Sequence, residues 1–146
     1  GFPAGLVVST EEILAQWQKG DQSSTFQLGP IAAAASQSFI SKLKNDDFTK
    51  NAKKQSLTFK TELKSLKLDR ELVDVRGIGS FWVLEFNSQE TNMRVRKQAL
   101  GNGLITWECG EGGECLGLVP PLNADLRIIE KACRIITKSV SEVLQL

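Results

Sequence analysis

The sequence contains no histidine and no tyrosine. The absence of histidine excludes Ser-His and Cys-His catalytic triads, histidine general bases and histidine metal ligands. Any polar chemistry must therefore come from lysine, aspartate, glutamate, cysteine, serine or threonine side chains. The three cysteines are an odd number, which does not fit the disulfide framework of a small secreted protein.

Long apolar runs are also missing, since none approaches the roughly 20 residues that span a bilayer. The first residues lack the basic region of a secretory signal peptide. The 18 basic and 17 acidic residues nearly cancel, so the net charge of +1 gives no argument for a nucleic-acid or membrane partner. We expect a cytoplasmic protein that binds neither nucleic acid nor membrane. With 146 residues, 41% of them hydrophobic, the chain is long enough for one domain with its own core.

The first 29 residues contain a short apolar pattern, a helix signal and a polar loop. Leu6–Val8 predict a short strand, and residues 20–29 predict a loop. Between them, Ser9 and Glu12 fit a capping box, in which the serine hydroxyl caps the helix and the glutamate reaches back. We expect the short helix that follows to end at Gly20. It would carry three apolar side chains, Ile13, Leu14 and Trp17.

Two helices are predicted between residues 30 and 66. Pro30 suits the first turn of an alanine-rich helix that runs to Leu43. Asn45–Asp47 break this helix and cap the next one, on which apolar residues recur at helical spacing. These residues are Phe48, Ala52, Phe59, Leu63 and Leu66. The lysines of the stretch Lys42–Lys67 lie opposite that stripe without interleaved aromatic residues, which favours a solvated helix face over a phosphate-binding surface.

From residue 72 the predicted order is strand, strand, helix, strand, strand, helix. This order predicts an α+β fold, with a small, mostly antiparallel sheet and helices on one face. The expected strands are 72–75, 81–86, 104–108 and 116–119, and the expected helices are 88–100 and a last helix capped by Asn123. The buried stripe of the last helix is predicted to be Leu126, Ile129, Cys133, Ile136, Val140 and Val143.

Three local motifs are candidates for chemistry in this second half. Cys109 and Cys115 flank an acidic, glycine-rich loop, which predicts either a flexible hairpin with two independent thiols or a reversible disulfide with a redox-sensing role. No metal site is predicted there, because zinc takes four ligands, usually at CxxC spacing, and no histidine completes the set. Arg76–Gly79 predict a glycine turn between strands, since the GxGxxG pattern of a dinucleotide loop is absent. Trp82 and Trp107 are expected in the core or an interface.

The loop before the alanine-rich helix is the most informative local feature. Ser23, Ser24 and Thr25 place hydroxyl groups just before a helix N-terminus. Hydroxyls and free N–H groups at such a place can hold a phosphate, and an ordinary helix-leading loop is the alternative.

Taken in order, four segments resemble the C-terminal part of class III pyridoxal-phosphate-dependent aminotransferases, the family of ornithine, 4-aminobutyrate and diaminobutyrate aminotransferases. Gly1–Val8 are similar to the glycine-rich turn and strand that follow the family's Schiff-base lysine. Ser24–Ala32 resemble the family's S-T-F-x-G-N-P-L-A. Residues 74–79, followed by residues 84–86, are similar to its D-V-R-G-x-G and the strand behind it. Residues 103–105 and 118–122 are similar to its G-L-L and its L-x-P-P-L.

This resemblance implies the C-terminal small domain of a fold-type I aminotransferase, with residues 1–29 left from the large cofactor domain and residues 30–146 forming the small domain. The intact enzyme is then expected to use pyridoxal 5'-phosphate and to act as a homodimer. It would transfer an amino group between an amino acid or ω-amine and a 2-oxo acid. The preferred donor is diaminobutyrate-like. Thr25 matches the family's phosphate-binding threonine, donated across the dimer interface, and Ser24 is expected beside it as a second cofactor-binding residue.

Three departures from the family pattern qualify this expectation. The chain begins inside the glycine-rich turn, so no lysine here occupies the Schiff-base position, no catalytic residue is assigned, and the 146 residues alone are expected to be inactive. Leu28 and Gly29 replace the family's glycine and asparagine. Gly117 stands where the family often has an arginine for the substrate carboxylate. The alternative is a non-catalytic module of the same fold, kept for dimerisation or partner binding.

Overall fold

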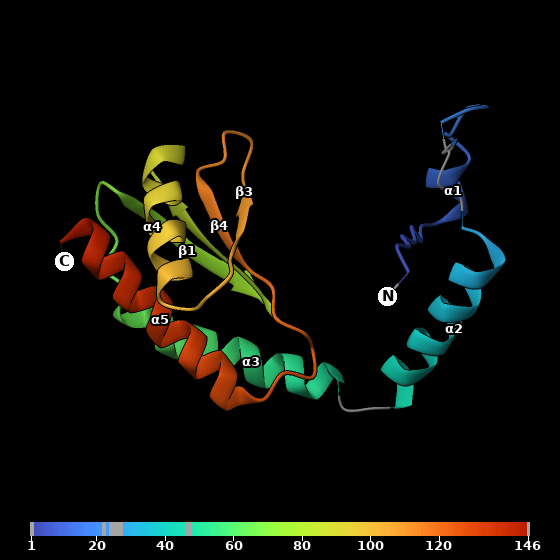
Figure 1. Ribbon diagram of the computed structural model, residues 1–146. Helices are drawn as coiled ribbons and strands as arrows, with labels where there is room; N and C mark the ends of the chain where they lie inside the picture. Colours follow the sequence, from blue (N-terminus) through green and yellow to red (C-terminus); the bar gives the residue numbers. More distant parts are fainter. Residues whose placement is uncertain (1, 22, 24–27, 46–47, 146) are drawn as a thin grey trace. The chain divides into compact units, whose positions relative to one another are not determined.

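The computed structural model describes residues 2–21, 23, 28–45 and 48–145, which fall into two compact units (Figure 1). The N-terminal unit is Gly1–Asp46 and the C-terminal unit is Asp47–Leu146. Within the described ranges, no helix is both long and apolar enough to cross a membrane.

The N-terminal unit contains two helices, α1 (Glu11–Leu14) and α2 (Pro30–Asn45). The alanine-rich helix is confirmed with Pro30 as its first residue. The capping box is wrong, because Thr10 is the N-cap of α1 and no side chain there accepts a capping hydrogen bond. The helix is also shorter than predicted and ends before Trp17. It buries none of its residues, and a helix this short is not stable without tertiary packing.

The strand predicted at Leu6–Val8 is also wrong, since the described part of the N-terminal unit contains no strand. The side chains of these three residues are between 71% and 82% exposed. A strand needs a neighbour to satisfy its backbone hydrogen bonds, and none of the described residues of this unit supplies one.

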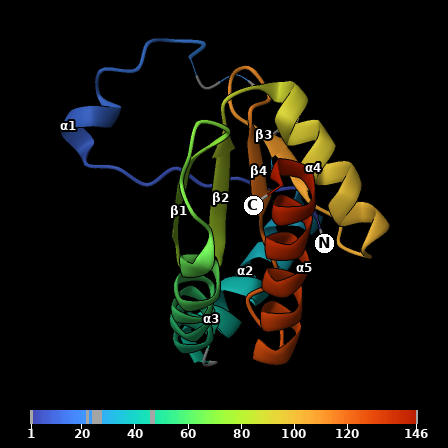
Figure 2. The same cartoon turned by 90° about the vertical axis from the view of Figure 1, so that its left-hand side faces the viewer.

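The C-terminal unit is built on a four-stranded sheet of strand order β1-β2-β4-β3, antiparallel at every pairing. Three helices and a short 3₁₀ turn pack with it, and Figure 2 shows α4 and α5 together on one side of the sheet. The α+β class is therefore confirmed. The elements are α3 (Phe48–Glu62), η1 (Leu63–Ser65), β1 (Leu72–Ile78), β2 (Phe81–Phe86), α4 (Gln89–Gly101), β3 (Trp107–Cys109), β4 (Cys115–Leu118) and α5 (Leu126–Leu144).

A single hydrophobic core lies between the sheet and these helices. Alternate residues of β2 point into it, and Leu84 is fully buried. The predicted stripe of α5 is confirmed at its centre, where four residues are at most 1% exposed, whereas Leu126 and Val143 at its ends are only partly buried. These four are Ile129, Cys133, Ile136 and Val140. On α3 and η1 the predicted stripe buries Phe59 and Leu63, and the lysines opposite are exposed.

Trp82 joins the sheet to α3. Its indole stacks on Phe59, with ring centroids 5.9 Å apart, and its Nε1 donates to the carbonyl oxygen of Gly79 at 3.1 Å. The ring also lies against Gly77, where an added Cβ would stand 2.4 Å from Trp82 Cδ2. The same Cβ would stand 2.5 Å from the Phe81 carbonyl oxygen, so the indole and the backbone of β2 together require glycine at position 77.

Three predicted features differ from the structure by more than a single-residue shift. The turn expected at Arg76–Gly79 is mostly strand, because β1 continues to Ile78, and Gly77 serves the contact with Trp82 rather than a turn. The strand expected from Leu104 begins only at Trp107, since the Leu104 N–H closes the end of α4 on Ala99 O at 2.8 Å. Asp125 caps α5 in place of Asn123, accepting a hydrogen bond from the Arg127 N–H at 2.8 Å.

Two polar side chains fix loops to the core from within helices. Asn92 of α4 donates to the carbonyl oxygens of Gly113 and Cys115 at 2.7 and 2.8 Å, which holds the β3–β4 hairpin. Gln55 of α3 donates to Pro121 O at 3.1 Å. Because both side chains are fully buried, these bonds replace contacts with water and fix where the loops run.

Replacing Gly77 by alanine should lower the free energy of unfolding by about 1–3 kcal/mol, because the new methyl group overlaps the Trp82 ring and the Phe81 carbonyl oxygen. Urea unfolding of the protein measures this change. Gly101→Ala is the matched control, since nothing lies within 4 Å of its Cβ position, and it should cost no stability. Equal stability of the two variants would contradict the assignment.

Candidate functional site

The predicted cofactor-binding residues Ser24 and Thr25 lie outside the described residues. The chain resumes at Leu28, and α2 begins at Pro30. The first turn of α2 carries no acidic residue. Pro30 has no N–H and the Ala33 N–H donates to Gly29 O, so the N–H groups of Ile31 and Ala32 are the ones without a partner in the helix, and they present partial positive charge, which suits an anion. The described flank of the loop therefore has the donor chemistry that a phosphate requires.

The second candidate region is the face of the sheet opposite the helices, here called the open face. Val83 and Glu85 of β2 belong to it, because their neighbours along the strand point into the core. Directly paired residues of an antiparallel sheet share a face. One row across the open face is accordingly Arg76, Val83, Gly117 and Trp107.

Arg76 is held on the open face by two carboxylates. Its guanidinium donates to Asp74 Oδ2 at 2.8 Å and also bonds to Glu85. The hydrogen bonds that the guanidinium donates to Asp74 and Glu85 raise the pKa of Arg76 above its usual value. Since two negative charges already surround it, Arg76 presents no unpaired positive charge to an incoming carboxylate.

Gly117 lies in β4 with space for a side chain. An added Cβ would stand 3.4 Å from Cys109 Sγ and 3.6 Å from Trp107 Cβ, which are ordinary van der Waals distances. The backbone conformation therefore does not require glycine here. The place that the resemblance assigns to a carboxylate-binding arginine is open to a side chain and contains none.

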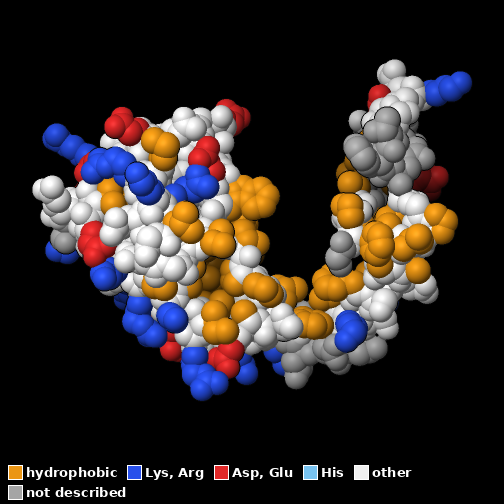
Figure 3. Space-filling view, in the orientation of Figure 1, with side chains coloured by type: hydrophobic (Ala, Val, Ile, Leu, Met, Phe, Trp, Pro, Cys, Tyr) orange, Lys and Arg blue, Asp and Glu red, His pale blue; other side chains and the backbone are white. Residues whose placement is uncertain are grey.

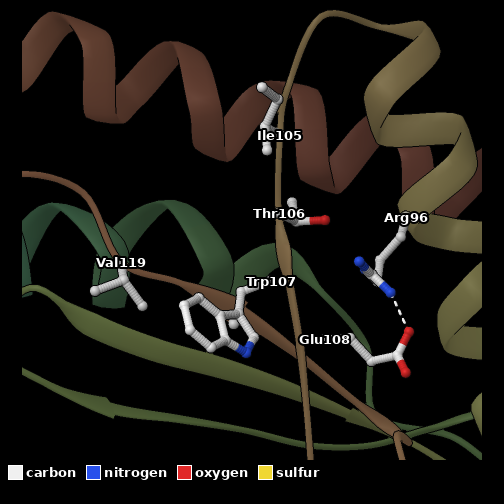
Figure 4. Close-up of a pocket in the computed structure, with 7 residues that line it drawn as sticks. Arg96, Ile105, Thr106, Trp107, Glu108 and Val119 are labelled. Atoms are coloured by element: carbon white, nitrogen blue, oxygen red, sulfur yellow. Dashed lines mark hydrogen bonds and ion pairs between the residues drawn. The ribbon is translucent and has the colours of Figure 1, made fainter. Parts of the chain in front are cut away.

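Gly117 is one of the residues that line a hollow of about 490 Å³, and Figure 4 labels the other lining residues. Its apolar side is formed by Ile105, Trp107 and Val119, and Trp107 is 68% exposed, so it does not belong to the core, unlike the buried Trp82. Figure 4 shows the Trp107 indole directed toward Val119, whereas Glu108 points the other way and pairs with Arg96 of α4. The ion pair neutralises the one cation among the lining residues.

The cysteine pair belongs to strands rather than to the loop between them. Cys109 and Cys115 are paired residues of β3 and β4, and both are free thiols. Gly110 and Gly113 turn the chain between them with φ of 90° and 75°. In the part of the chain that the structure describes, no three Cys, Asp or Glu side chains are grouped to hold a metal ion.

Sequence reasoning missed the ion pairs Arg76–Asp74–Glu85 and Arg96–Glu108. The first had a usable signal, since Asp74 and Arg76 are two residues apart and a strand places such residues on one face. The second joins α4 to β3, and no spacing in the sequence indicates it.

Comparison with known proteins adds to this geometry. Residues 1–140 match the family model "Aminotransferase class-III". The acetylornithine aminotransferase of Caldanaerobacter subterraneus subsp. tengcongensis is 30% identical over 144 residues, which cover 98% of this chain and 36% of that protein. The diaminobutyrate–2-oxoglutarate transaminase of Oceanobacillus iheyensis is 27% identical over 147 residues, covering 99% of this chain and 34% of that protein.

Among solved structures, the ornithine aminotransferase of Plasmodium yoelii superposes with a TM-score of 0.69 at 27% identity. The superposition covers 93% of this chain and 36% of that one. The chain thus spans about a third of the length of the relatives that it matches. Class III aminotransferases are pyridoxal-phosphate-dependent. The match over residues 1–140 shows that the chain belongs to the class III aminotransferase family.

Proposed function

We propose that this chain is the C-terminal part of a pyridoxal-phosphate-dependent aminotransferase. The whole enzyme would transfer an amino group between an amino acid or ω-amine and a 2-oxo acid, and we propose that it works as a cytoplasmic homodimer. The observation that carries the proposal is the family match over residues 1–140 in a chain that spans 36% of its acetylornithine aminotransferase relative.

We further propose that residues 1–29 complete a larger cofactor domain and that residues 30–146 are the small domain with its linking helix. None of the described residues of the N-terminal unit is fully buried, and Leu6–Val8 expose apolar side chains without a strand partner. Such a segment gains stability by joining a sheet elsewhere. The C-terminal unit, in contrast, has a hydrophobic core of its own.

In this proposal Ser24 and Thr25 hold the cofactor phosphate through their hydroxyl groups, together with the first N–H groups of α2. The absence of acidic side chains from the first turn of α2 supports this role, because a carboxylate there would repel the dianion. When bound, pyridoxal phosphate supplies an electron sink for the charge that develops on the substrate. The contribution of this chain is to fix and orient the phosphate end of the cofactor.

For the substrate we propose a diaminobutyrate-like ω-amino donor, whose carboxylate is not recognised through residue 117. Gly117 offers no cation, and the nearby arginines Arg76 and Arg96 are paired with carboxylates. The similarity to a diaminobutyrate–2-oxoglutarate transaminase at 27% identity supports this donor class.

A non-catalytic dimerisation or partner-binding module is the second candidate. The observation that favours it is the apolar character of the open face and its edge, where Figure 3 shows hydrophobic side chains gathered near β3 and β4. The exposed fractions are 82% for Ile78, 51% for Phe81, 68% for Trp107 and 58% for Val119. A surface of this kind is typical of an interaction site.

The 146 residues alone should not catalyse transamination above the rate of free pyridoxal phosphate. The physical reason is that the proposed enzyme draws its covalent lysine from a segment that this sequence does not include. Amino transfer from 2,4-diaminobutyrate to 2-oxoglutarate, followed by chromatography of glutamate, measures it. Turnover by the chain alone would contradict the proposal. The second measurement uses the joined enzyme, in which the proposed upstream segment with the covalent lysine precedes these 146 residues. Inactivity of the joined enzyme would favour the non-catalytic module.

In that joined enzyme, Thr25→Ala should weaken pyridoxal phosphate binding by about 10-fold or more, since a hydrogen bond to a charged group contributes about 1.5–3 kcal/mol. Fluorescence titration with the cofactor gives the dissociation constant. Thr25→Ser should retain most of the affinity because the hydroxyl group is kept, and Ser23→Ala is the control. An unchanged affinity of Thr25→Ala would refute the assignment.

Gly117→Ala should leave the free energy of unfolding unchanged or raise it by about 0.4–1 kcal/mol, because the methyl group fits and the unfolded chain loses freedom. The matched control is Gly113→Ala, where φ is +75° and the added Cβ stands 2.8 Å from Gln89 Nε2, so stability should fall. Urea unfolding compares the two. Strong destabilisation by Gly117→Ala would mean that the glycine is structural.

A further inference from the structure

We propose that Cys109 and Cys115 form a reversible disulfide across the β3–β4 hairpin, so that this edge of the sheet is a thiol–disulfide site. The proposal concerns thiol chemistry only and does not rest on the aminotransferase function.

The register brings the two residues directly opposite each other. Cys109 pairs with Cys115 in the antiparallel β3–β4 ladder, as Trp107 pairs with Gly117. Directly opposed residues in such a ladder point to the same face, with Cα atoms about 4.5 or 5.5 Å apart. Disulfides bridge Cα separations of about 4.4–6.8 Å. The bond is therefore compatible with the backbone as it stands.

The hairpin holds this register firmly. Asn92 of α4 binds the carbonyl oxygens of Gly113 and Cys115, one within the loop and one at the start of β4. The loop closes on itself through the Gly113 N–H, which donates to Gly110 O at 3.3 Å. Positive φ at both glycines makes this short turn possible. A preformed turn lowers the entropy lost when the two sulfur atoms are joined.

The Cys109 sulfur atom has unfilled space beside it, at Gly117. Cys109 Sγ lies 3.4 Å from the point where a Cβ of residue 117 would stand, and glycine leaves that point empty. Both cysteines belong to the open face, which no described helix of the C-terminal unit packs against. A small oxidant in solution can therefore approach Cys109, which is half-buried, before Cys115, which is 4% exposed.

The third cysteine provides an internal contrast. Cys133 lies on α5 in the core with an exposed fraction of 0%. Burial raises its pKa to about 12, so it is almost entirely protonated at neutral pH. The reactive thiolate is correspondingly scarce at Cys133, and no oxidant reaches it without unfolding.

Burial, followed by the nearby Glu114 carboxylate, raises the pKa of both Cys109 and Cys115. The two thiols are therefore mostly protonated at neutral pH. Exchange is consequently slow there and faster under mildly alkaline conditions, where more thiolate forms. Arg76 and Arg96 oppose this effect at Cys109. The two thiols therefore form a pair that reacts with an added oxidant, and they are not a permanent disulfide.

The oxidant in this proposal is a small-molecule disulfide. The Cys109 thiolate attacks one of its sulfur atoms, which forms a mixed disulfide and releases one thiol. The Cys115 thiolate then attacks the Cys109 sulfur and expels the second thiol. Two S–H bonds of the protein are lost and one S–S bond forms, while the oxidant's S–S bond breaks and takes up both electrons and both protons. Excess thiol reverses each step.

The test begins with the fully reduced protein incubated with hydroxyethyl disulfide under mildly alkaline conditions. Intact mass should fall by two hydrogen atoms, and peptide mapping should find Cys109 joined to Cys115 while Cys133 is still alkylated as a free thiol. Dithiothreitol should restore the original mass. Three free thiols after incubation, or a bridge that includes Cys133, would overturn the proposal.

Serine variants separate the two steps. Cys115→Ser should accumulate the mixed disulfide on Cys109, seen as a stable mass increase. Cys109→Ser should show neither the bridge nor that adduct. Cys133→Ser is the matched control and should lose two hydrogen atoms as the unaltered protein does. A stable adduct on the unaltered protein in place of the bridge would also refute the proposal, and this measurement requires no variant to fold.

Discussion

The contact between the Trp82 indole and Gly77 sets the arrangement of the C-terminal unit. The indole has room on β1 only because residue 77 has no side chain, and from there it reaches Phe59 of α3 and Gly79 O. Buried aromatic rings such as Trp82 and Phe59 contribute a large share of the energy of a core. Because β2 lies between β1 and β4, the face on which Trp82 is buried decides which residues of every other strand meet the helices.

The open face follows from the same alternation. With Trp82 and Leu84 in the core, Val83 and Glu85 must point away from it, and their neighbours across the sheet are Arg76, Gly117 and Cys115. This face combines paired charges, an unfilled position at Gly117 and two opposed thiols. Its described residues include no unpaired arginine. In the proposed enzyme the substrate carboxylate is therefore not bound by an arginine of this face.

The sequence predicted the regular elements well where a period extends over many residues. The stripe of α5 was predictable because four buried residues recur at helical spacing, and the strand at Phe81–Phe86 because its residues favour strands. Errors occurred where one residue type serves two purposes. Gly77 and Gly79 look alike in a sequence, yet Gly79 turns the chain with φ of 58° while Gly77 makes room for the Trp82 indole and the Phe81 carbonyl oxygen.

The candidate site was predictable to a smaller extent. Gln55 binds Pro121 O, 66 residues away, and no local pattern indicates such a bond. The capping box at Ser9 failed because the helical turn begins one residue later, with Thr10 as an N-cap whose side chain makes no capping hydrogen bond. Gly117 was identified through family resemblance, and the structure added that the position is open to a side chain. Ser24 and Thr25 remain a proposal from resemblance, supported by the chemistry of α2.

A crystal structure of the joined enzyme with pyridoxal phosphate tests the central claim most directly. The account predicts that the Thr25 hydroxyl lies within hydrogen-bond distance of a phosphate oxygen, with the first turn of α2 directed at the same group. A phosphate held entirely by other residues, with Thr25 in solvent, would contradict it.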